Sequence, residues 1–452
     1  MTRLESWMQE AFRCLDSPAE RRPASAERPG FGGSTLSFVK KETKEVAQTI
    51  LTFLKWLFIA LLTGAAGGLV GSVFHLSVGK ATAVRTAHPW LLYLLPAAGL
   101  LIGLVYHFLH TENKNTNTVI DSIQLGERVP LALVPTIFLA TVITHLFGGS
   151  AGREGAALQI GGSLGNTVGR LCRLDDKDMR IATLSGMSAV FSALFGTPLT
   201  ATVFALEVIS VGVIYYSAFL PCLVASLIAL QISVLFGIAP EHFLIPELSL
   251  QAGMALRISG LAILCTLLSI IFCLTMHGTE HFLKKKIPND FVRVLFGGAS
   301  IVGLTLLLGT GEFNGAGMES IKRAVEEGVA RPDAFFWKLL FTALTLGTGY
   351  KGGEVVPCFF VGATFGCVVG ALLGIPAGFA AAVGLVCLFC GAVNCPLASI
   401  LLSVELFGSG SIIYFALSCG IAYMLSGYFG LYSSQKIMYS KLKAEFINIH
   451  AK

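Results

Sequence analysis

Very long stretches without a charged residue dominate this sequence. Residues 355–404 contain no Asp, Glu, Lys or Arg, and residues 406–435 contain none either. Further uncharged stretches of 18 residues or more cover residues 56–76, 90–109, 129–152, 181–206, 208–240, 258–279 and 294–311. About 20 apolar residues span a bilayer as a helix, so these stretches predict many membrane-spanning helices. Only 13% of the residues are charged, about half of the share in soluble domains, and we therefore expect a multi-pass protein of the cell membrane.

Some uncharged stretches are too short to cross a bilayer as a helix. Residues 155–169 and residues 339–350 are two such stretches. Pro357, Pro376 and Pro396 also divide the longest uncharged stretch into several segments. These features predict an all-α integral membrane bundle of tilted and broken helices with re-entrant half-helices. Broken helices inside a membrane are typical of transport proteins.

The charges that do occur predict how the chain is oriented in the membrane. The net charge of +5 comes from 32 basic and 27 acidic residues, a balance that gives no reason to expect nucleic acid as a partner. Basic clusters flank the apolar segments at Lys40, Lys41 and Lys44, at residues 284–286, and at Lys436, Lys441 and Lys443. Because cytoplasmic loops carry an excess of Lys and Arg, we expect both termini and the central loop in the cytoplasm.

The composition also predicts two regions and argues against a metal site. Residues 1–47 are rich in polar residues and are expected to form a cytoplasmic helix and linker, followed by a transport domain over residues 48–452. The sequence has 11 cysteines, mostly inside apolar stretches, and its one close pair, Cys387 and Cys390, has no second pair to complete a zinc site. We therefore expect buried thiols and no metal or other cofactor.

Three landmarks recur in the same order about 200 residues apart. The segment from Asn117 to Asp121 resembles the segment from Gly315 to Glu319. Glu154 matches Glu354, and Pro198 with Glu207 matches Pro396 with Glu405. Matched landmarks of this kind predict two homologous repeats, at about residues 50–240 and 250–450, an organisation found in many transporters. The residues alone leave open whether the repeats are parallel or inverted.

Glu154 lies in a glycine-rich turn, Gly152-Arg153-Glu154-Gly155, between two apolar stretches. Glycines let the backbone approach a ligand, and the free amides at the start of a helix form an anion site. A carboxylate can occupy the same position, so Glu154 is expected to compete with an anion when ionised and to carry a proton when neutral. The alternative is an Arg153–Glu154 ion pair that braces the turn.

Glu354 repeats this design in Gly353-Glu354-Val355-Val356-Pro357, where the proline suits the first turn of a helix. We expect Glu354 either to carry a proton or to pair with Lys351.

Other polar residues near apolar helices have two interpretations each. Asn115, Thr116 and Asn117 precede an apolar helix, where they serve either as a plain N-terminal cap or as ion ligands. The hydroxyl of Tyr432 either faces an ion or belongs to the aromatic belt at the membrane boundary.

At these residues the sequence resembles the CLC family of anion channels and proton-coupled antiporters, over about residues 50–445. The resemblance implies an inverted-repeat, all-helical homodimer in which each subunit holds its own ion pathway. Glu154 then matches the external gating glutamate, and Tyr432 matches a tyrosine whose hydroxyl faces the central anion. Residues 115–118 stand where the family usually has a serine-containing loop, so the usual serine ligand is absent.

Within the family, the run from Lys351 to Val355 resembles the bacterial fluoride/proton antiporters, whose second glutamate matches Glu354. Val208 stands where chloride/proton antiporters carry an internal proton-transfer glutamate. The resemblance therefore implies a fluoride/proton antiporter that exports fluoride, and the alternative is a chloride channel or chloride/proton exchanger. The expected ion-binding residues are Asn115, Thr116, Asn117, Gly152, Arg153, Gly155, Gly353, Val355, Val356 and Tyr432.

Two functions of other classes compete with transport. An intramembrane enzyme is not expected, because the sequence has neither a His-Glu-x-x-His helix nor a pair of Asp residues in facing apolar segments. A structural membrane scaffold would not need carboxylates at matched positions of two repeats. The expected partners are fluoride or chloride, protons, the lipid bilayer and a second copy of the chain.

Overall fold

The computed structural model describes residues 35–112 and 114–452. The chain divides into two compact units, Met1–Ile59 and Ala60–Lys452. The described part of the first unit belongs to one long helix, α2 (Thr35–Ala87), which continues into the second unit. Of the helix and linker expected over residues 1–47, residues 1–34 lie outside the described residues. The expected boundary after residue 47 falls inside α2.

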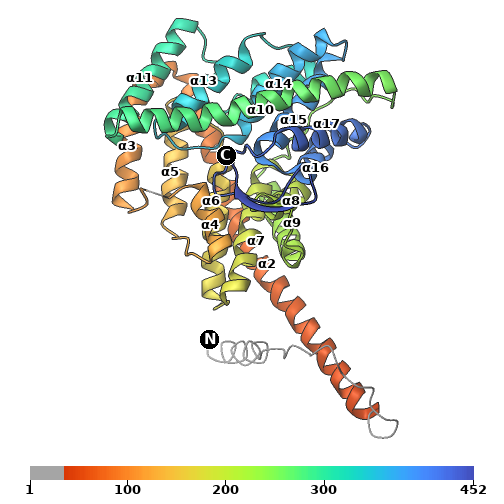
Figure 1. The fold of residues 1–452 in the computed structure, drawn as a ribbon. Coiled ribbons are helices and arrows are strands. Elements are labelled where there is room, and N and C mark those ends of the chain that lie inside the picture. The colour runs from red at the N-terminus through yellow and green to blue at the C-terminus, as the bar shows by residue number, and fades with distance from the viewer. Residues whose placement is uncertain (1–34, 113) are drawn as a thin grey trace. The chain divides into compact units, whose positions relative to one another are not determined.

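Helices make up most of the second unit (Figure 1). After α2 the α-helices are α3 (Leu95–Phe108), α4 (Thr116–Leu125), α5 (Leu133–Leu146), α6 (Glu154–Leu171), α7 (Asp176–Phe195), α8 (Pro198–Glu207), α9 (Phe219–Leu235), α10 (Ala252–Lys286), α11 (Asp290–Leu308), α12 (Met318–Lys322), α13 (Ala334–Gly347), α14 (Val355–Leu372), α15 (Ala377–Val393), α16 (Pro396–Phe407) and α17 (Ile412–Leu425). Short 3-10 or π turns occupy Pro89–Leu94, Tyr216–Ala218 and Arg323–Glu327.

The helices of the two halves follow one another in the same order. Helices α5 and α13 have 14 residues each, and α6 and α14 have 18 residues each. Helices α8 and α16 both begin at a proline, which fits the first turn because its missing N–H needs no partner there. The helix order therefore agrees with the sequence repeat.

Matched glycines pack one helix pair in each half. A Cβ added to Gly161 of α6 would lie 2.4 Å from the carbonyl oxygen of Gly186 in α7. A Cβ added to Gly362 of α14 would likewise lie 2.4 Å from the carbonyl oxygen of Gly384 in α15. Because no side chain fits between these backbones, glycine is what allows α6 and α14 to pack closely on their neighbours.

Two glutamates tie the halves together by capping each other's helices. The Glu405 carboxylate at the end of α16 accepts hydrogen bonds from the amides of Leu199 and Thr200, at 2.9 and 2.8 Å. The Glu207 carboxylate at the end of α8 accepts from the amides of Leu397 and Ala398, at 3.2 and 2.9 Å. Negative charge is favourable at a helix N-terminus, so each carboxylate compensates the first turn of the other repeat's helix.

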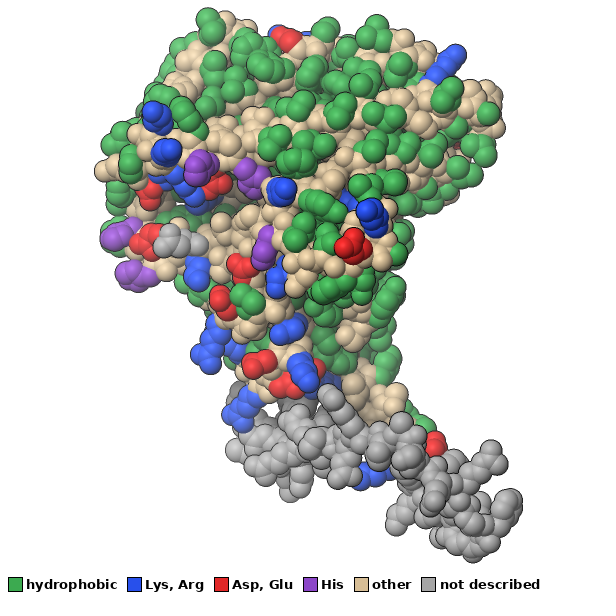
Figure 2. Space-filling view, viewed as in Figure 1, with side chains coloured by type: hydrophobic (Ala, Val, Ile, Leu, Met, Phe, Trp, Pro, Cys, Tyr) green, Lys and Arg blue, Asp and Glu red, His purple; other side chains and the backbone are tan. Residues whose placement is uncertain are grey.

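Several helices are suited to a lipid environment. Six helical segments within the described residues are long and apolar enough to cross a membrane, and five further apolar helices have only 10–17 residues. The short set includes α13, which contains most of the expected short stretch at residues 339–350, whereas the other expected short stretch, residues 155–169, lies in α6, which has 18 residues. Figure 2 shows hydrophobic side chains over the region of α10 and its neighbours, where Leu256, Leu267 and Leu274 are exposed. An apolar exposed surface of this kind matches lipid.

A small sheet departs from the purely helical expectation. Strand β1 (Ser210–Val211) pairs in parallel with β2 (Lys436–Tyr439), and β2 pairs antiparallel with β3 (Phe446–His450). This sheet brings the C-terminal segment beside the end of α8. Strands of two to five residues lack the apolar periodicity from which the sequence could have predicted them.

Candidate functional site

The two glycine-rich loops that precede α6 and α14 pair directly with each other. The amide of Gly152 donates to the carbonyl oxygen of Gly353 at 2.7 Å, and the amide of Gly353 donates to that of Gly152 at 2.8 Å. A Cβ added to Gly353 would lie 2.5 Å from the amide nitrogen of Gly155. The matched loops of the two repeats therefore meet at one point, and only glycine permits so close an approach.

The Glu154 carboxylate lies at this meeting point and is fully buried. Its Oε2 accepts a hydrogen bond from the amide of Arg153 at 2.9 Å and from the amide of Val356 at 3.3 Å. The second contact comes from the first turn of α14, in the other repeat. Oε1 of Glu154 has no hydrogen-bond partner in the part of the chain that the structure describes. The carboxylate thus occupies a place where backbone amides favour an anion.

Arg153 does not neutralise this carboxylate. Its guanidinium lies 3.7 Å from Glu241 and donates to the carbonyl oxygen of Leu194 at 3.4 Å. Among the described residues the Arg153–Glu154 ion pair is not formed, so the bracing alternative has no support here. Among the described residues, no side-chain cation lies within hydrogen-bond distance of the Glu154 carboxylate.

Glu354 is the residue before the first turn of α14, its side chain makes no capping hydrogen bond, and its Oε2 has no partner among the described residues. That oxygen lies 3.2 Å from the position of a Cβ added to Gly155, so the side chain points toward the Glu154 loop. The alternative for Glu354, an ion pair with Lys351, is not formed in the described residues. The Lys351 ammonium lies instead over the ring of Tyr106, 4.6 Å from its centroid.

The three expected ligands at the start of α4 make structural hydrogen bonds. Asn115 is the N-cap, since its side chain accepts from the Thr118 amide at 3.2 Å. The Asn117 amide group donates to Ser433 Oγ at 3.0 Å and accepts from the Ser434 amide at 3.2 Å. The capping interpretation is therefore correct for Asn115, and the Asn117 amide holds the loop next to Tyr432.

Thr116 connects α4 to α6 through a residue that the sequence reasoning missed. Its hydroxyl donates to the carbonyl oxygen of Gly155 at 3.4 Å and accepts from Gln159 Nε2 at 3.1 Å. The Oε1 atom of Gln159 is buried and has no partner. Gln159 lies five residues after Glu154, and a polar residue within an apolar helix was the available signal.

The Tyr432 hydroxyl is also buried without a partner, and the residue is 2% exposed. It lines a cavity of about 370 Å³ together with Asn115, Thr116, Asn117, Gln159, Lys351 and Glu354. A belt residue would be exposed to the membrane boundary, so the ion-facing interpretation of Tyr432 fits this position better. Val355 and Val356 are buried in the first turn of α14 and contribute backbone groups.

This arrangement suits a dehydrated anion and a proton better than a metal ion. Among the described residues no group of three or more His, Cys, Asp or Glu side chains is placed to hold a metal. Backbone amides and hydroxyls supply donors, and two carboxylates from the two repeats supply proton acceptors. Buried polar groups are normally paired, so the oxygens of Glu154, Glu354 and Tyr432, which have no partner among the described residues, make this region a candidate site.

Comparisons with known proteins agree with this description. A family model described as voltage gated chloride channel matches residues 98–427. A chloride/fluoride channel protein of Pseudomonas syringae is 37% identical over 396 residues, 86% of this chain and 87% of the relative. An H⁺/Cl⁻ exchange transporter, ClcA, of Vibrio cholerae is 27% identical over 420 residues, 82% of this chain and 86% of the relative.

Solved structures match as well. A CLC-type fluoride/proton antiporter has a TM-score of 0.82 and 30% identity, and the match covers 85% of this chain and 98% of that one. A slow cyanobacterial Cl⁻/H⁺ antiporter has a TM-score of 0.70 and 18% identity, covering 82% and 94% of the two chains. These likenesses confirm the predicted class of fold, a bundle of tilted and broken membrane helices.

Proposed function

The chain belongs to the voltage-gated chloride channel family, and from this membership we propose that it is a fluoride/proton antiporter that exports fluoride from the cytoplasm. It is a multi-pass membrane protein of a transporter family. Two of the relatives above are named for fluoride, one by sequence and one by structure. Their activity supports the proposal for this chain.

One observation carries the proposal most directly. The Glu154 carboxylate accepts hydrogen bonds from the amides of Arg153 and Val356, at the point where the two repeats meet. An ionised carboxylate and a small anion cannot occupy this place together, because both need the same donors. When Glu154 binds a proton, it loses its charge and releases the amides to fluoride. Exchange of a proton for fluoride follows from this competition.

Glu354 supplies the second proton site in this proposal. Its unpaired Oε2 points toward the Gly155 loop and its side chain lines the cavity with Tyr432. Val208, where a related exchanger would carry an internal glutamate, is fully buried and has no titratable group. We therefore assign the inner part of the proton route to Glu354.

Fluoride is preferred over chloride in the proposal because of the donors around the pathway. A small, strongly hydrated anion needs several close donors when it loses water. The hydroxyl of Tyr432, the second N–H of the Gln159 amide group and the amides at the start of α14 are the available donors, since the Thr116 hydroxyl already donates to Gly155. Chloride/proton exchange is the second candidate, and the similarity to ClcA favours it. We also propose a homodimer with one pathway in each subunit.

Flux measurements in liposomes test the function. Purified protein is reconstituted in vesicles loaded with fluoride or chloride, and anion efflux and external pH are recorded together. Fluoride efflux with matching proton uptake, and little chloride efflux, is expected. Glu154→Gln should lose the proton uptake, whereas Glu241→Gln, which removes only the partner of Arg153, should retain it.

Three results would contradict parts of the proposal. Fluoride efflux without proton movement would indicate a channel, and faster chloride than fluoride efflux would place the protein with the chloride transporters. The absence of any anion flux from the vesicles would favour the interpretation of the protein as a structural membrane scaffold. The dimer is checked separately by the mass of the purified protein in detergent.

A further inference from the structure

A second cavity of about 430 Å³ lies beside the one that Tyr432 lines. Its walls come from α3, from the segment between α3 and α4, from the end of α10, from α11 and from the loop before α14. The two cavities share Tyr106, Lys114, Asn115, Glu280, Lys284 and Lys351. Lys284, which belongs to the basic end of α10 at residues 284–286, lines the cavity, so positive-inside orientation makes this the cytoplasmic side.

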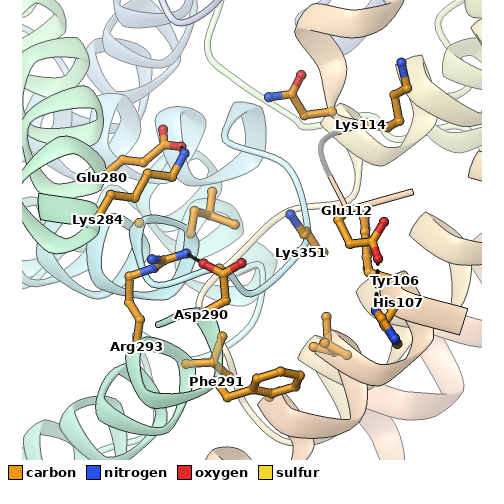
Figure 3. Close-up of a pocket in the computed structure, with 18 residues that line it drawn as sticks. Tyr106, His107, Glu112, Lys114, Glu280, Lys284, Asp290, Phe291, Arg293 and Lys351 are labelled. Carbon is orange, nitrogen blue, oxygen red and sulfur yellow. Dashed lines mark hydrogen bonds and ion pairs between the residues drawn. The ribbon is translucent and has the colours of Figure 1, made fainter. Parts of the chain in front are cut away.

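Charged side chains surround this cavity, and the acidic ones already have partners. Figure 3 shows Lys351 between two groups of charged side chains, with Glu280, Lys284, Asp290 and Arg293 in one group and His107, Glu112 and Lys114 in the other. Glu280 pairs with Lys284 at 2.6 Å, Asp290 pairs with Arg293, and Glu112 pairs with His107 at 3.1 Å.

The cations of the cavity wall exceed its carboxylates. Four Lys and Arg side chains line it, namely Lys114, Lys284, Arg293 and Lys351, against the three carboxylates of Glu112, Glu280 and Asp290. Within the described residues, Lys114 and Lys351 form no ion pair. A recess whose walls carry an excess of one sign of charge concentrates ions of the opposite sign. The wall therefore attracts anions.

Lys351 is the cation that lies between the two groups of side chains (Figure 3). Its ammonium lies over the Tyr106 ring and has no hydrogen-bond acceptor among the described residues. An ammonium has three donors, so Lys351 retains donors for an anion in the cavity. The Tyr106 hydroxyl beside it is also buried without a partner, in a residue that is 4% exposed. Two unsatisfied donor side chains thus border the same recess.

We propose that this cavity is a capture site for the transported anion on the cytoplasmic side, with Lys351 as its anchor and the Tyr106 hydroxyl as a second donor. Fluoride enters here before it reaches Tyr432, because the two cavities share the wall that holds Lys351. The inference rests on the proposed function for its ligand and direction of transport. Lys351 acts in binding and capture, whereas Glu154 and Glu354 act on the proton.

Half-saturation measurements test this site. Fluoride efflux is measured against fluoride concentration at constant ionic strength for the wild type and for Lys351→Gln, Lys351→Met and Lys351→Arg. Calorimetric titration of the purified proteins with sodium fluoride provides an independent reading of binding. Lys285→Gln is the matched control, since it removes an exposed charge from the same end of α10 and lines neither cavity.

The neutral variants should raise the half-saturating fluoride concentration by about tenfold, the low end of the effect of a charged cleft on ligand capture. The maximal rate and the number of protons per fluoride should change by less than about twofold, and high salt should weaken the wild type more than the variants. Lys351→Arg should restore most of the affinity. Lys351→Met keeps the apolar stem against Tyr106 and provides a second neutral variant if Lys351→Gln does not fold.

Two outcomes overturn the inference. One is an unchanged half-saturating concentration in the neutral variants, or the same increase in Lys285→Gln. The other is an altered ratio of protons to fluoride at unchanged affinity, which would mean that Lys351 acts on Glu354. A wild type that moves chloride but no fluoride contradicts the proposed substrate instead, and the same comparison is then made with chloride.

Discussion

At the scale of single residues, the site is marked by polar atoms that lack partners. Glu154 Oε1, Glu354 Oε2 and the Tyr432 hydroxyl are buried and unpaired, although most polar side chains of the core are hydrogen-bonded. Leaving such a group unpaired costs about 1–3 kcal/mol of folding free energy. We propose that the missing partner of these three groups is a transported ion.

Replacing Tyr432 by phenylalanine separates ion binding from folding. The hydroxyl has no protein partner, so Tyr432→Phe should leave the melting temperature unchanged or raise it slightly. A hydrogen bond to a charged group is worth about 1.5–3 kcal/mol, so the half-saturating fluoride concentration should rise by about tenfold or more. Fluoride titrations and thermal unfolding in detergent measure both effects.

Tyr414→Phe is the matched control for this prediction. The Tyr414 hydroxyl donates to the carbonyl oxygen of Ser249 at 2.9 Å and accepts from the Gln251 amide at 2.9 Å. Its loss should lower the melting temperature and leave fluoride affinity unchanged. A similar loss of stability in both variants would mean that Tyr432 is a structural residue.

Adding one methyl group at Gly152 should displace the Glu154 carboxylate from the amides of Arg153 and Val356. The new Cβ would lie 2.2 Å from Glu154 Oε2 and 3.1 Å from Pro357 Cδ, and moving the carboxylate is the only flexible way to relieve the contact. Gly152→Ala should reduce proton-coupled fluoride efflux by about tenfold or more, because two charge-assisted hydrogen bonds are lost. Gly303→Ala, whose Cβ meets nothing within 4 Å, should transport normally. Normal coupling in Gly152→Ala would show that Glu154 works from another position.

At the scale of elements, carboxylates stabilise helix ends that the apolar pattern of the sequence does not determine. Glu207 and Glu405 cap each other's repeats, and the Glu154 loop pairs with the Glu354 loop. Short helices such as α8 and α16 bury part of their ends inside the protein, where water cannot satisfy the first amides. The repeats therefore depend on each other for these hydrogen bonds.

Neutralising one of these caps should lower stability without changing the ion specificity. Glu405→Gln keeps the shape of the side chain but replaces one accepting oxygen with a donor that faces an amide. The free energy of unfolding should fall by about 1 kcal/mol, as expected for the loss of a hydrogen bond at a half-buried side chain. Thermal unfolding in detergent measures the change. Glu326→Gln, in a surface pair with Lys322 at 3.9 Å, should change stability little, and equal losses in both would contradict the capping role.

Because of Lys441, the stability of the folded protein is expected to depend on pH. It lies between β2 and β3, outside the membrane-spanning helices, and donates to Asn394 Oδ1 and Ser426 Oγ. Burial lowers the pKa of Lys441 from its ordinary value to about 8. Between pH 8 and about 10.4 the unfolded chain keeps a proton that the folded protein has released, so this contribution to stability rises with pH in that window.

The measurement for Lys441 is the melting temperature between pH 7 and 10. The wild type should gain stability relative to Lys441→Met as the pH rises above 8, by at most about 1.4 kcal/mol per pH unit. Lys443→Met, which changes an exposed side chain, should follow the pH profile of the wild type. Parallel profiles for the wild type and Lys441→Met would contradict a lowered pKa.

At the scale of the whole molecule, the features predicted correctly are those that follow from the uncharged stretches and from the sequence repeat. Uncharged stretches predict the helices, and the matched landmarks place Glu154 and Glu354 at equivalent positions in the two halves. Contacts between distant segments were not predictable, because nothing in the sequence pairs Asn117 with Ser433 or Arg153 with Glu241. Gln159 was missed because its role depends on Thr116, a residue of another helix.

In the proposed mechanism, the joining of the two repeats also determines where a proton crosses the molecule. Glu154 and Glu354 come from different halves and approach each other through the paired loops. Glu354→Gln should therefore reduce proton uptake by about 100-fold, the low end for a side chain that transfers a proton, while fluoride still binds. Adding Val208→Glu to this variant should not restore proton uptake, because position 208 is fully buried and lines neither cavity. Glu319→Gln, at a matched position of the repeat outside both cavities, is the control, and simultaneous fluoride and pH recordings give the result. Normal proton uptake in Glu354→Gln, or its rescue by Val208→Glu, would mean that protons follow a different route through the protein.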